Sequence, residues 1–537
     1  MPPAVMATGT ATATDMATAM DMAAMTRRRA EPRCLAFAAA AWAMAAHAQQ
    51  GLTAAPAGSM IVQPRIGVMQ TWTDNLRLQE HDKDAALITT LSPGIRILSN
   101  SGSLRGSVDY TLNGIAYLKT DQPARFQNSL VANAQAELIS RTLFVDMRAN
   151  IGQQNASAFG QQSAPTLGSQ GAVNNLANQN QHETGTLAIA PSLRGMLGGV
   201  ATYDLRGEFT RTEARGTSLG DSRGSSGTLR IDQWNAGMLG WWLQANTQQV
   251  KPKTARSNRS ETLKAGVNYR PDPDWFFTLD AGRERNDFLG SGTQDGPTGG
   301  VTAEWTPTPR TRMGANWQYH DYGNSHGLTF EHRMARSVWR FADMSTTTLG
   351  NTGAPGGVRT YYDQFFLLFA SVEPDPVQRD VRVRQELQRQ GLSPDAPLAN
   401  GFLSTGPSRL RSQQLGVTLQ GVRSSLSAQL SRSITRRLGS NLNQGDLANT
   451  SRVEQRSYAL TASHQLTPLS GVSLTASRQE STGDFANQSI QLTSWIASWN
   501  ARLGPRLNGQ LGARHSRSEG AAPYTENAVY ANLTQLF

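Results

Sequence analysis

The sequence predicts an all-β protein: a large transmembrane antiparallel up-and-down β-barrel of about 22 strands, with a small helical insert. Three observations lead to this prediction. Apolar and polar residues alternate in many segments, short turns alternate with longer polar loops, and aromatic residues gather at the segment ends. Together they are typical of barrels that cross a bacterial outer membrane.

The composition excludes several other classes of protein. The chain has 537 residues, of which 38% are hydrophobic and 17% charged, with one cysteine and a net charge of +10. After residue 60 no apolar run is long enough for a transmembrane helix, and a lone cysteine excludes a disulfide scaffold. Arginines recur singly along the chain, whereas a nucleic-acid-binding protein would concentrate them on one basic face. We therefore expect no nucleic-acid partner.

The first 48 residues read as a cleaved signal peptide. The arginines at 27–29 precede an apolar run from Cys34 to Ala46, and Ala46-His47-Ala48 supplies a small-x-small cleavage pattern. Residues 1–24 form a Met/Ala/Thr stretch that a signal peptide does not need, so Met25 is a second candidate for the start. Residues 49–59 read as a linker. The pattern predicts export through the inner membrane.

The rest of the chain alternates with period two. In segment 104–116 apolar residues fall on even positions and polar residues on odd ones, and the pattern recurs at 130–138, 143–151, 263–269, 313–319 and 507–513. A soluble sandwich or propeller would alternate in the same way. Here Ala and Gly are frequent on the apolar face, and aromatics such as Trp72, Phe126 and Trp275 lie near segment ends. Both features favour a membrane barrel with an interfacial aromatic girdle.

Turn lengths and strand number give the expected layout. Short turns such as 99–103 and 271–274 are expected to face the periplasm, and long polar loops such as 159–181 the outside. We count fourteen strands within the first barrel part, 60–343, and seven within the second, 410–537. A barrel with both ends in the periplasm needs an even number, so 398–405 is the candidate for a missing upward strand. The expected total is about 22, with 18 to 24 tolerated.

Residues 344–409 differ from their surroundings. Asp375-Pro376 resembles a helix start and Gly391 a helix stop, which predicts a helix over 376–390, and the apolar stretch 361–369 is a candidate second helix. The strand count places this insert in the periplasm. Two interpretations stay open: a long turn that folds locally, or a segment that docks a partner or plugs the pore.

Side-chain parity assigns residues to the two faces of the wall. The basic residues opposite the apolar rows are expected to line a water-filled, anion-attracting lumen; they are Arg105, Arg148, Lys264 and Arg312. The chain ends on a strand that resembles the signal read by the barrel assembly machinery, interrupted by Gln535 and carried by Val529, Ala531, Leu533 and Phe537.

We find no catalytic, cofactor or metal site. The pattern G-x-S-x-G occurs at 220–224 and 323–327, around Ser222 and Ser325, but neither copy is followed by the helix that a nucleophile elbow requires. No histidine pair has zinc spacing with a carboxylate, and there is no phosphate or dinucleotide loop. A non-enzymatic protein is expected, with an outer-membrane serine hydrolase as the rival from the enzyme class.

Four segments, 70–75 (QTWTDN), 91–95 (LSPGI), 108–110 (VDY) and the helical 377–392, resemble the outer-membrane barrels associated with the exosortase/PEP-CTERM system of Gram-negative bacteria. The resemblance implies a place beside exopolysaccharide export and carries over no catalytic residue. The predicted function is passage or guidance of a hydrophilic solute or exopolysaccharide, in contact with lipid and lipopolysaccharide. The alternative is a structural or assembly protein whose insert docks a periplasmic export partner.

Overall fold

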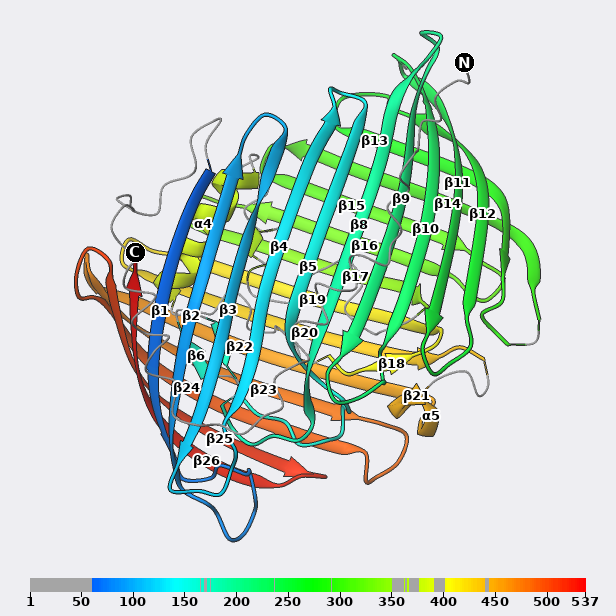
Figure 1. Ribbon diagram of the computed structural model, residues 1–537. Coiled ribbons are helices and arrows are strands. Elements are labelled where there is room, and N and C mark those ends of the chain that lie inside the picture. Colours follow the sequence, from blue (N-terminus) through cyan, green and yellow to red (C-terminus); the bar gives the residue numbers. More distant parts are fainter. Residues whose placement is uncertain are drawn as a thin grey trace, which may run out of the picture. The chain divides into compact units, whose positions relative to one another are not determined.

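The computed structural model describes residues 60–349 apart from 165, 169, 170, 174, 236 and 291, then 362, 365, 366, 376–390, 401–439 and 444–537. The predicted signal peptide, the linker and the helix-start residue Asp375 lie outside the described residues. Within them the chain forms one antiparallel sheet of 22 strands (Figure 1). The predicted barrel fold is confirmed.

The elements follow each other in this order: β1 (Met60–Thr73), β2 (Ala86–Asn100), β3 (Leu104–Leu118), β4 (Arg125–Ile139), β5 (Leu143–Asn155), β6 (Thr166–Gly168), β7 (Gly171–Val173), β8 (Gln181–Leu197), β9 (Ala201–Ala214), β10 (Ser222–Gln233), β11 (Leu239–Pro252), β12 (Asn258–Tyr269), β13 (Trp275–Asn286), β14 (Gln294–Thr308), β15 (Thr311–Tyr319), β16 (Ser325–Arg333), β17 (Ser337–Thr348), α4 (Pro376–Gln390), β18 (Ser404–Thr405), β19 (Ser408–Gln420), β20 (Ser424–Arg437), β21 (Gln444–Gly445), α5 (Asp446–Asn449), β22 (Arg452–Thr467), β23 (Ser470–Thr482), β24 (Ser489–Arg502), β25 (Leu507–Gly520) and β26 (Tyr524–Leu536).

The sheet closes where the first and last strands meet. β1 pairs with β26 from Arg65 opposite Leu536 to Thr73 opposite Ala528. We call this junction the seam. Closure gives both strands a partner on each side, so neither leaves its backbone donors and acceptors unpaired in lipid.

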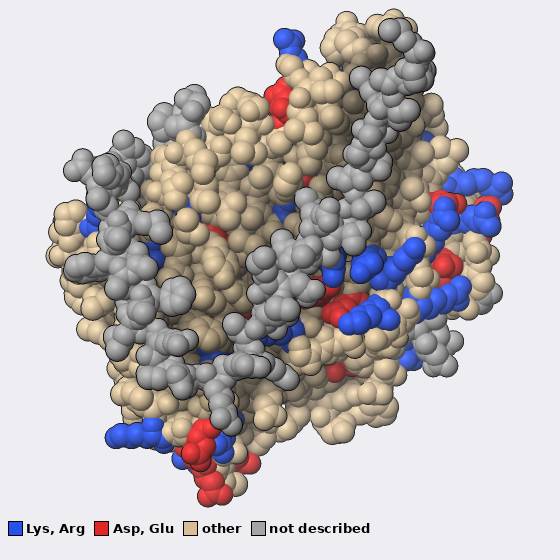
Figure 2. Space-filling model, viewed as in Figure 1, with Lys and Arg blue, Asp and Glu red and all other residues tan. Residues whose placement is uncertain are grey.

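Alternation along the strands separates a lipid-facing surface from a polar interior. Val68, Trp72 and Leu263 are among the exposed large apolar side chains, whereas their neighbours Thr71 and Thr73 are fully buried. In Figure 2, Lys, Arg, Asp and Glu gather toward the right and at the lower end of the face shown, and much of the wall at the upper left is tan. A closed wall with an apolar outer belt and polar inner face places the protein in the outer membrane. Among the described residues, no helix is long and apolar enough to cross a membrane.

The two ends of the barrel differ. Turns such as 101–103, 140–142 and 309–310 join strands at the end where β1 begins and β26 stops, while long connections such as 74–85 and 156–180 lie at the other end. Short turns face the periplasm in barrels of this class. The end with the long loops is therefore the outer end.

The predicted position of the insert is wrong. Fifteen barrel strands precede it and seven follow it. β17 therefore runs outward, and the insert joins the wall at the outer end, not in the periplasm. Of the strand expected over 398–405, the described residues 401–405 belong to no wall strand, and Ser404–Thr405 pairs with Gln444–Gly445 of a loop. The count before the insert was short by one strand, so the insert was assigned to the wrong end of the barrel.

Two outer loops fold back into the barrel beside the seam. Leu76 of loop 74–85 and Leu176 of loop 156–180 are fully buried, and both pack with inward-facing Ile88 and Tyr530. The Ala177 amide donates to the Leu76 carbonyl at 3.0 Å, which ties the two loops together. This part of the outer mouth is therefore filled by the protein itself.

Pro93 lies within β2, and the strand has no bulge there. The pairs Leu91–Gly114 and Gly94–Thr111 keep a single register with β3. The ladder to β3 skips Ser92 and Pro93 and resumes unchanged, so the missing proline N–H is accommodated without an extra residue.

Candidate functional site

Helix α4 lies inside the barrel. It contacts β3 on one side and β22 and β23 on the other. Along the wall these strands are separated by β2, β1, β26, β25 and β24. An element that contacts β3 and also β22 and β23, strands far apart around the wall, lies in the lumen, and Figure 1 shows α4 enclosed by the wall.

The sequence of α4 explains which of its sides are buried. Val383 and Leu387, one turn apart, are almost completely buried. Asp380 and Arg384 are also four residues apart, so they project from one side of the helix. There the Arg384 Nε donates to Asp380 Oδ1 at 2.9 Å. Gln378 and Gln385 lie on the exposed side.

Five charged side chains bind α4 to the wall, and we call this group the helix lock: Arg65, Arg96, Asp109, Asp380 and Arg384. Arg96 of β2 pairs with Asp380. Arg384 Nη1 donates to Asp109 Oδ2 of β3 at 2.6 Å, and Arg65 of β1 pairs with the other oxygen of Asp109. Three adjacent strands thus hold one helix through alternating charges.

Gly94 is the gap that makes this arrangement possible. Arg65 is on β1 and Asp109 is on β3, so the arginine must reach across β2. It crosses at Gly94, where an added Cβ would lie 2.9 Å from Arg65 Nε and 2.9 Å from the Tyr110 carbonyl oxygen. Arg65 Nη2 then also donates to Thr111 Oγ1 at 2.6 Å. Any larger residue at position 94 would obstruct this path.

Burial makes the helix lock sensitive to the loss of any member. The side chains of Arg96 and Asp380 are 5% and 4% exposed. Burial alone would raise the pKa of Asp380, but Arg384 and then Arg96 outweigh it and hold this pKa below its ordinary value. The Tyr362 hydroxyl donates to Asp380 Oδ1 at 2.7 Å, and burial raises the pKa of Tyr362. Removing one partner of a buried ion pair costs about 3–5 kcal/mol.

The helix lock lies far from the end at which the insert joins the wall. Arg96 is four residues from the periplasmic end of β2, and Asp109 is five residues from that of β3. The insert nevertheless leaves β17 and enters β19 at the outer end. After α4 the chain is again at the outer end, where the Leu403 amide donates to the carbonyl of Asn155, the last residue of β5, at 2.9 Å. Helix α4 therefore lies deep in the lumen, toward the periplasmic end, although the insert joins the wall at the outer end.

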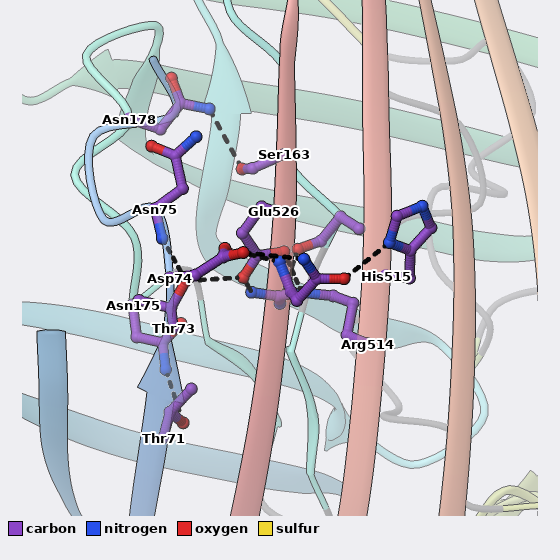
Figure 3. A network of polar contacts seen from close by, with 12 residues as sticks. Thr71, Thr73, Asp74, Asn75, Ser163, Asn175, Asn178, Arg514, His515 and Glu526 are labelled. Carbon is purple, nitrogen blue, oxygen red and sulfur yellow. Dashed lines mark hydrogen bonds and ion pairs between the residues drawn. The ribbon is translucent and has the colours of Figure 1, made fainter. Parts of the chain in front are cut away.

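A second buried network holds loop 156–180 at the seam (Figure 3). Arg514 Nη2 of β25 donates to Glu526 Oε1 of β26 at 2.7 Å, with both side chains at most 1% exposed. Thr73 Oγ1 of β1 donates to the same Glu526 oxygen at 3.0 Å, so three strands meet there. The loop attaches through its Ala164 carbonyl, which accepts from Arg514 Nη1 at 3.1 Å.

The four predicted lumen residues lie on the inward face of their strands, but they do not form one group. Arg105 lies on the same face of β3 as Asp109, and Arg148 lies on the same face of β5 as Asp146. Lys264 Nζ lies 3.6 Å from Asp280 Oδ2, which offsets its charge. Among the described residues no ion pair involves Arg105, Arg148 or Arg312. None of the four touches the helix lock.

Three of the four predicted assembly residues lie on the last strand, at the expected parity. Val529, Ala531 and Leu533 are exposed on the lipid side of β26. Phe537 follows the strand, and its amide donates to the Pro64 carbonyl of β1 at 3.0 Å. The C-terminal residue thus extends the seam by one hydrogen bond.

The candidate catalytic serines have no supporting site. Ser222 begins β10 and Ser325 begins β16, and each continues into a strand, not a helix. No group of three or more His, Cys, Asp or Glu among the described residues could hold a metal ion. The established architecture is that of an outer-membrane barrel, and nothing in these two segments forms a nucleophile elbow.

A groove of about 1260 Å³ lies on the outside of the wall. Its lining includes the lipid-facing side chains Trp72, Leu426, Leu474 and Val529. Several alanines lie between these larger residues, so the groove is a shallow depression in the apolar belt. Its larger lining side chains face lipid.

Sequence reasoning missed the helix lock, although parity places Arg65, Arg96 and Asp109 on the inward face of neighbouring strands. Three of the segments that suggested the family contribute to it: 91–95 contains Gly94, 108–110 contains Asp109, and 377–392 contains Asp380 and Arg384. Two signals were available in the sequence. One was the charged residues at inward positions of adjacent strands, and the other was an Asp and an Arg four residues apart in the one helix whose bounds the sequence predicted.

No family model matches the sequence, and no curated protein does. Among solved structures, the siderophore receptor PirA from Pseudomonas aeruginosa matches at 11% identity and a TM-score of 0.40, over 88% of this chain and 80% of that one. The FrpB iron transporter from Neisseria meningitidis matches at 10% and 0.45, over 88% and 82%. OmpTdeltaL8, a loop-deletion mutant of an outer membrane protein of Vibrio cholerae, matches at 6% and 0.30, over 89% and 99%. These likenesses concern the barrel alone and say nothing of what this chain transports.

Proposed function

We propose that this outer-membrane barrel is a gated channel for a hydrophilic solute, in which α4 is the plug and the helix lock keeps it closed. The observation that carries the proposal is the binding of an outer-end insert deep in the lumen by Arg65, Arg96 and Asp109 of the wall. A barrel of this strand number encloses a lumen wide enough for water unless it is filled.

The chemistry of the attachment favours a releasable plug over a permanent core. Ion pairs can be exchanged for water or for a charged solute, whereas a buried apolar contact has no such substitute. The helix lock has three guanidinium groups and two carboxylates. An entering anion would therefore meet a surplus of positive charge and compete with Asp109 and Asp380 for the arginines.

The proposed solute is anionic, and an exopolysaccharide fits this chemistry. Arg105, Arg148 and Arg312 on the inward face add to the surplus of the helix lock. A positive lumen raises the local concentration of anions, and salt weakens the effect. The association with an exosortase/PEP-CTERM system rests on the resemblance of four short segments and is part of this proposal.

Planar-bilayer conductance tests the proposal. We expect rare openings for the wild type and frequent openings for Asp380→Asn, because the substitution leaves Arg96 buried without its carboxylate. The matched control is Gln385→Ala on the exposed side of α4, which should behave as wild type. In the open state Arg148→Glu with Arg312→Glu should reduce anion selectivity. Equal conductance of Asp380→Asn and wild type, with both proteins heat-modifiable in gels and hence folded, would refute gating by the helix lock.

The alternative in which the insert docks a periplasmic partner has lost its main support. It required the insert to emerge into the periplasm, and the insert emerges at the outer end. The serine hydrolase has no structural support at Ser222 or Ser325. Labelling of the purified protein with a serine-directed fluorophosphonate should give no modification at either residue.

A further inference from the structure

The outward face of β20, β22 and β23 carries a concentration of arginine near the outer end. We call it the arginine patch, and it consists of Arg432, Arg436, Arg452, Arg456 and Arg478 with Glu454 and Glu480. Its strand positions share parity with exposed, lipid-facing Leu430, Leu460 and Leu474. The arginine patch is therefore on the outside of the barrel and separate from the helix lock.

Like charges lie directly opposite each other in this patch. Arg432 pairs across the strands with Arg456, and Arg436 pairs with Arg452. Two cross-strand pairs of the same sign destabilise a sheet, and the cost rises where lipid lowers the local dielectric constant. A bound anion would offset this cost.

Glu454 gathers three of the arginines without neutralising them. Its Oε1 accepts from Arg432 Nε at 2.7 Å and from Arg456 Nε at 2.9 Å, and Arg452 pairs with the same carboxylate. On β23, Arg478 Nε donates to Glu480 Oε1 at 2.6 Å. Five guanidinium groups thus face two carboxylates, and the side chains of Arg432, Arg456 and Arg478 are 42%, 46% and 52% exposed.

The arginine patch lies where the apolar belt ends. Leu430 and Tyr458, two residues below Arg432 and Arg456, form the next outward pair, and below them Ala428 pairs with Leu460. Tyr458 and Leu460 are 41% and 47% exposed, as lipid-facing residues are. A tyrosine at this border marks the level of the lipid headgroups. The arginines above it are therefore at the headgroups of the outer leaflet.

Two other outward arginines at this end each have a carboxylate of their own. Arg517 of β25 lies 2.7 Å from Glu519, and Arg411 of β19 lies 2.6 Å from Asp343. Single exposed pairs of this kind contribute little and need no ligand. The surplus of charge distinguishes the arginine patch from them.

We propose that the arginine patch binds the phosphate groups of a phosphorylated lipid headgroup in the outer leaflet. Guanidinium groups bind phosphate through paired, charge-assisted hydrogen bonds, and the exposed ends of Arg432 and Arg456 converge beside Glu454. The site holds a membrane lipid against the outer wall and stabilises the barrel there. It is independent of whether the lumen conducts.

The test uses the full-length protein in detergent after removal of bound lipid. Native mass spectrometry compares binding of bis-phosphorylated lipid A with binding of its dephosphorylated form, and thermal unfolding followed by heat-modifiability gives a second readout. We expect Arg432→Gln with Arg456→Gln to weaken binding of the phosphorylated form about tenfold or more. The matched control Arg517→Gln should bind as wild type. Only the phosphorylated form should raise the unfolding temperature.

Three results would overturn the proposal: equal binding by the double variant, equal binding of the dephosphorylated lipid, or displacement of the lipid by millimolar inorganic phosphate, which would point to a free anion as the ligand. If the double variant does not fold, the salt dependence of lipid binding by the wild type still tests the proposal. Binding through exposed guanidinium groups must weaken as salt rises, and binding unaffected by salt would contradict the proposal.

Discussion

At the scale of single residues, Gly94 decides whether the helix lock can form. A methyl group there would meet Arg65 Nε and the Tyr110 carbonyl oxygen, each at 2.9 Å. We predict that Gly94→Ala displaces Arg65 from Asp109 and increases channel openings, at a cost of about 1–3 kcal/mol in stability as for other overpacked sites. Single-channel recording measures the first effect and thermal unfolding the second.

Gly102→Ala is the matched control. Nothing lies within 4 Å of the Cβ that this change would add in the turn between β2 and β3. Openings should stay at the wild-type level. If Gly94→Ala also leaves them unchanged, Arg65 does not need its path across β2, and its contact with Asp109 does not hold α4.

Acid should open the channel within a defined range of pH. The pKa of Asp380 is lowered, so its stabilising effect is present above the ordinary value of 3.8 and is lost as pH falls through the lower folded-state pKa. Asp380 faces Arg96, Arg384 and the Tyr362 hydroxyl, none of which titrates in acid. We predict a closed channel from neutral pH to about pH 4 and openings only below it. Opening between pH 7 and 5 in bilayer recordings would assign control to another group.

Parity predicted the side of the wall for individual residues but not their partners. Arg105, Arg148, Lys264 and Arg312 were placed inside because alternation is a local property of one strand. The pairing of Lys264 with Asp280 depends on the register between β12 and β13, which sequence does not specify residue by residue. The contacts of the helix lock were harder still to predict from sequence, since they join residues almost 300 positions apart.

At the scale of elements, local rules predicted α4 and failed on its location. Pro376 at the start and Gly391 after the end define the helix from neighbouring residues alone. The side of the membrane depends on every strand before it. The predicted number of strands before the insert was one too low, and the prediction added one strand at 398–405. The two errors cancelled, so the total of 22 was right although the division of the strands before and after the insert was wrong.

The last strand offers a test at this scale. Phe537 directly follows β26, and its amide donates to the Pro64 carbonyl of β1, so a residue predicted to belong to the assembly signal also extends the seam. We predict that deletion of Phe537 lowers the yield of heat-modifiable barrel in outer membranes far more than Gln535→Ala does. Similar yields for the two variants would show that the assembly signal was assigned to the wrong residues.

At the scale of the whole molecule, two obstructions occupy the half of the barrel around the seam. α4 is bound by β1, β2 and β3 toward the periplasm, and loop 156–180 is bound through Arg514 and Glu526 toward the outside. Obstructions that follow one another along a pore limit current in series, so the narrower one sets the conductance. Removing either alone leaves the other in place.

We therefore predict that shortening both segments raises conductance by more than the sum of the single changes. In one variant a short Gly/Ser linker replaces residues 350–400, in the second a linker replaces 163–176, and the third carries both. All three retain the 22 paired strands, so each should stay heat-modifiable, and lipid-facing residues are untouched. Planar-bilayer recording should show small steps for the single variants and large, steady steps for the combined one. If the loop variant alone conducts as fully as the combined one, α4 does not obstruct the path, and the helix lock is an internal brace that stabilises the wall rather than a gate.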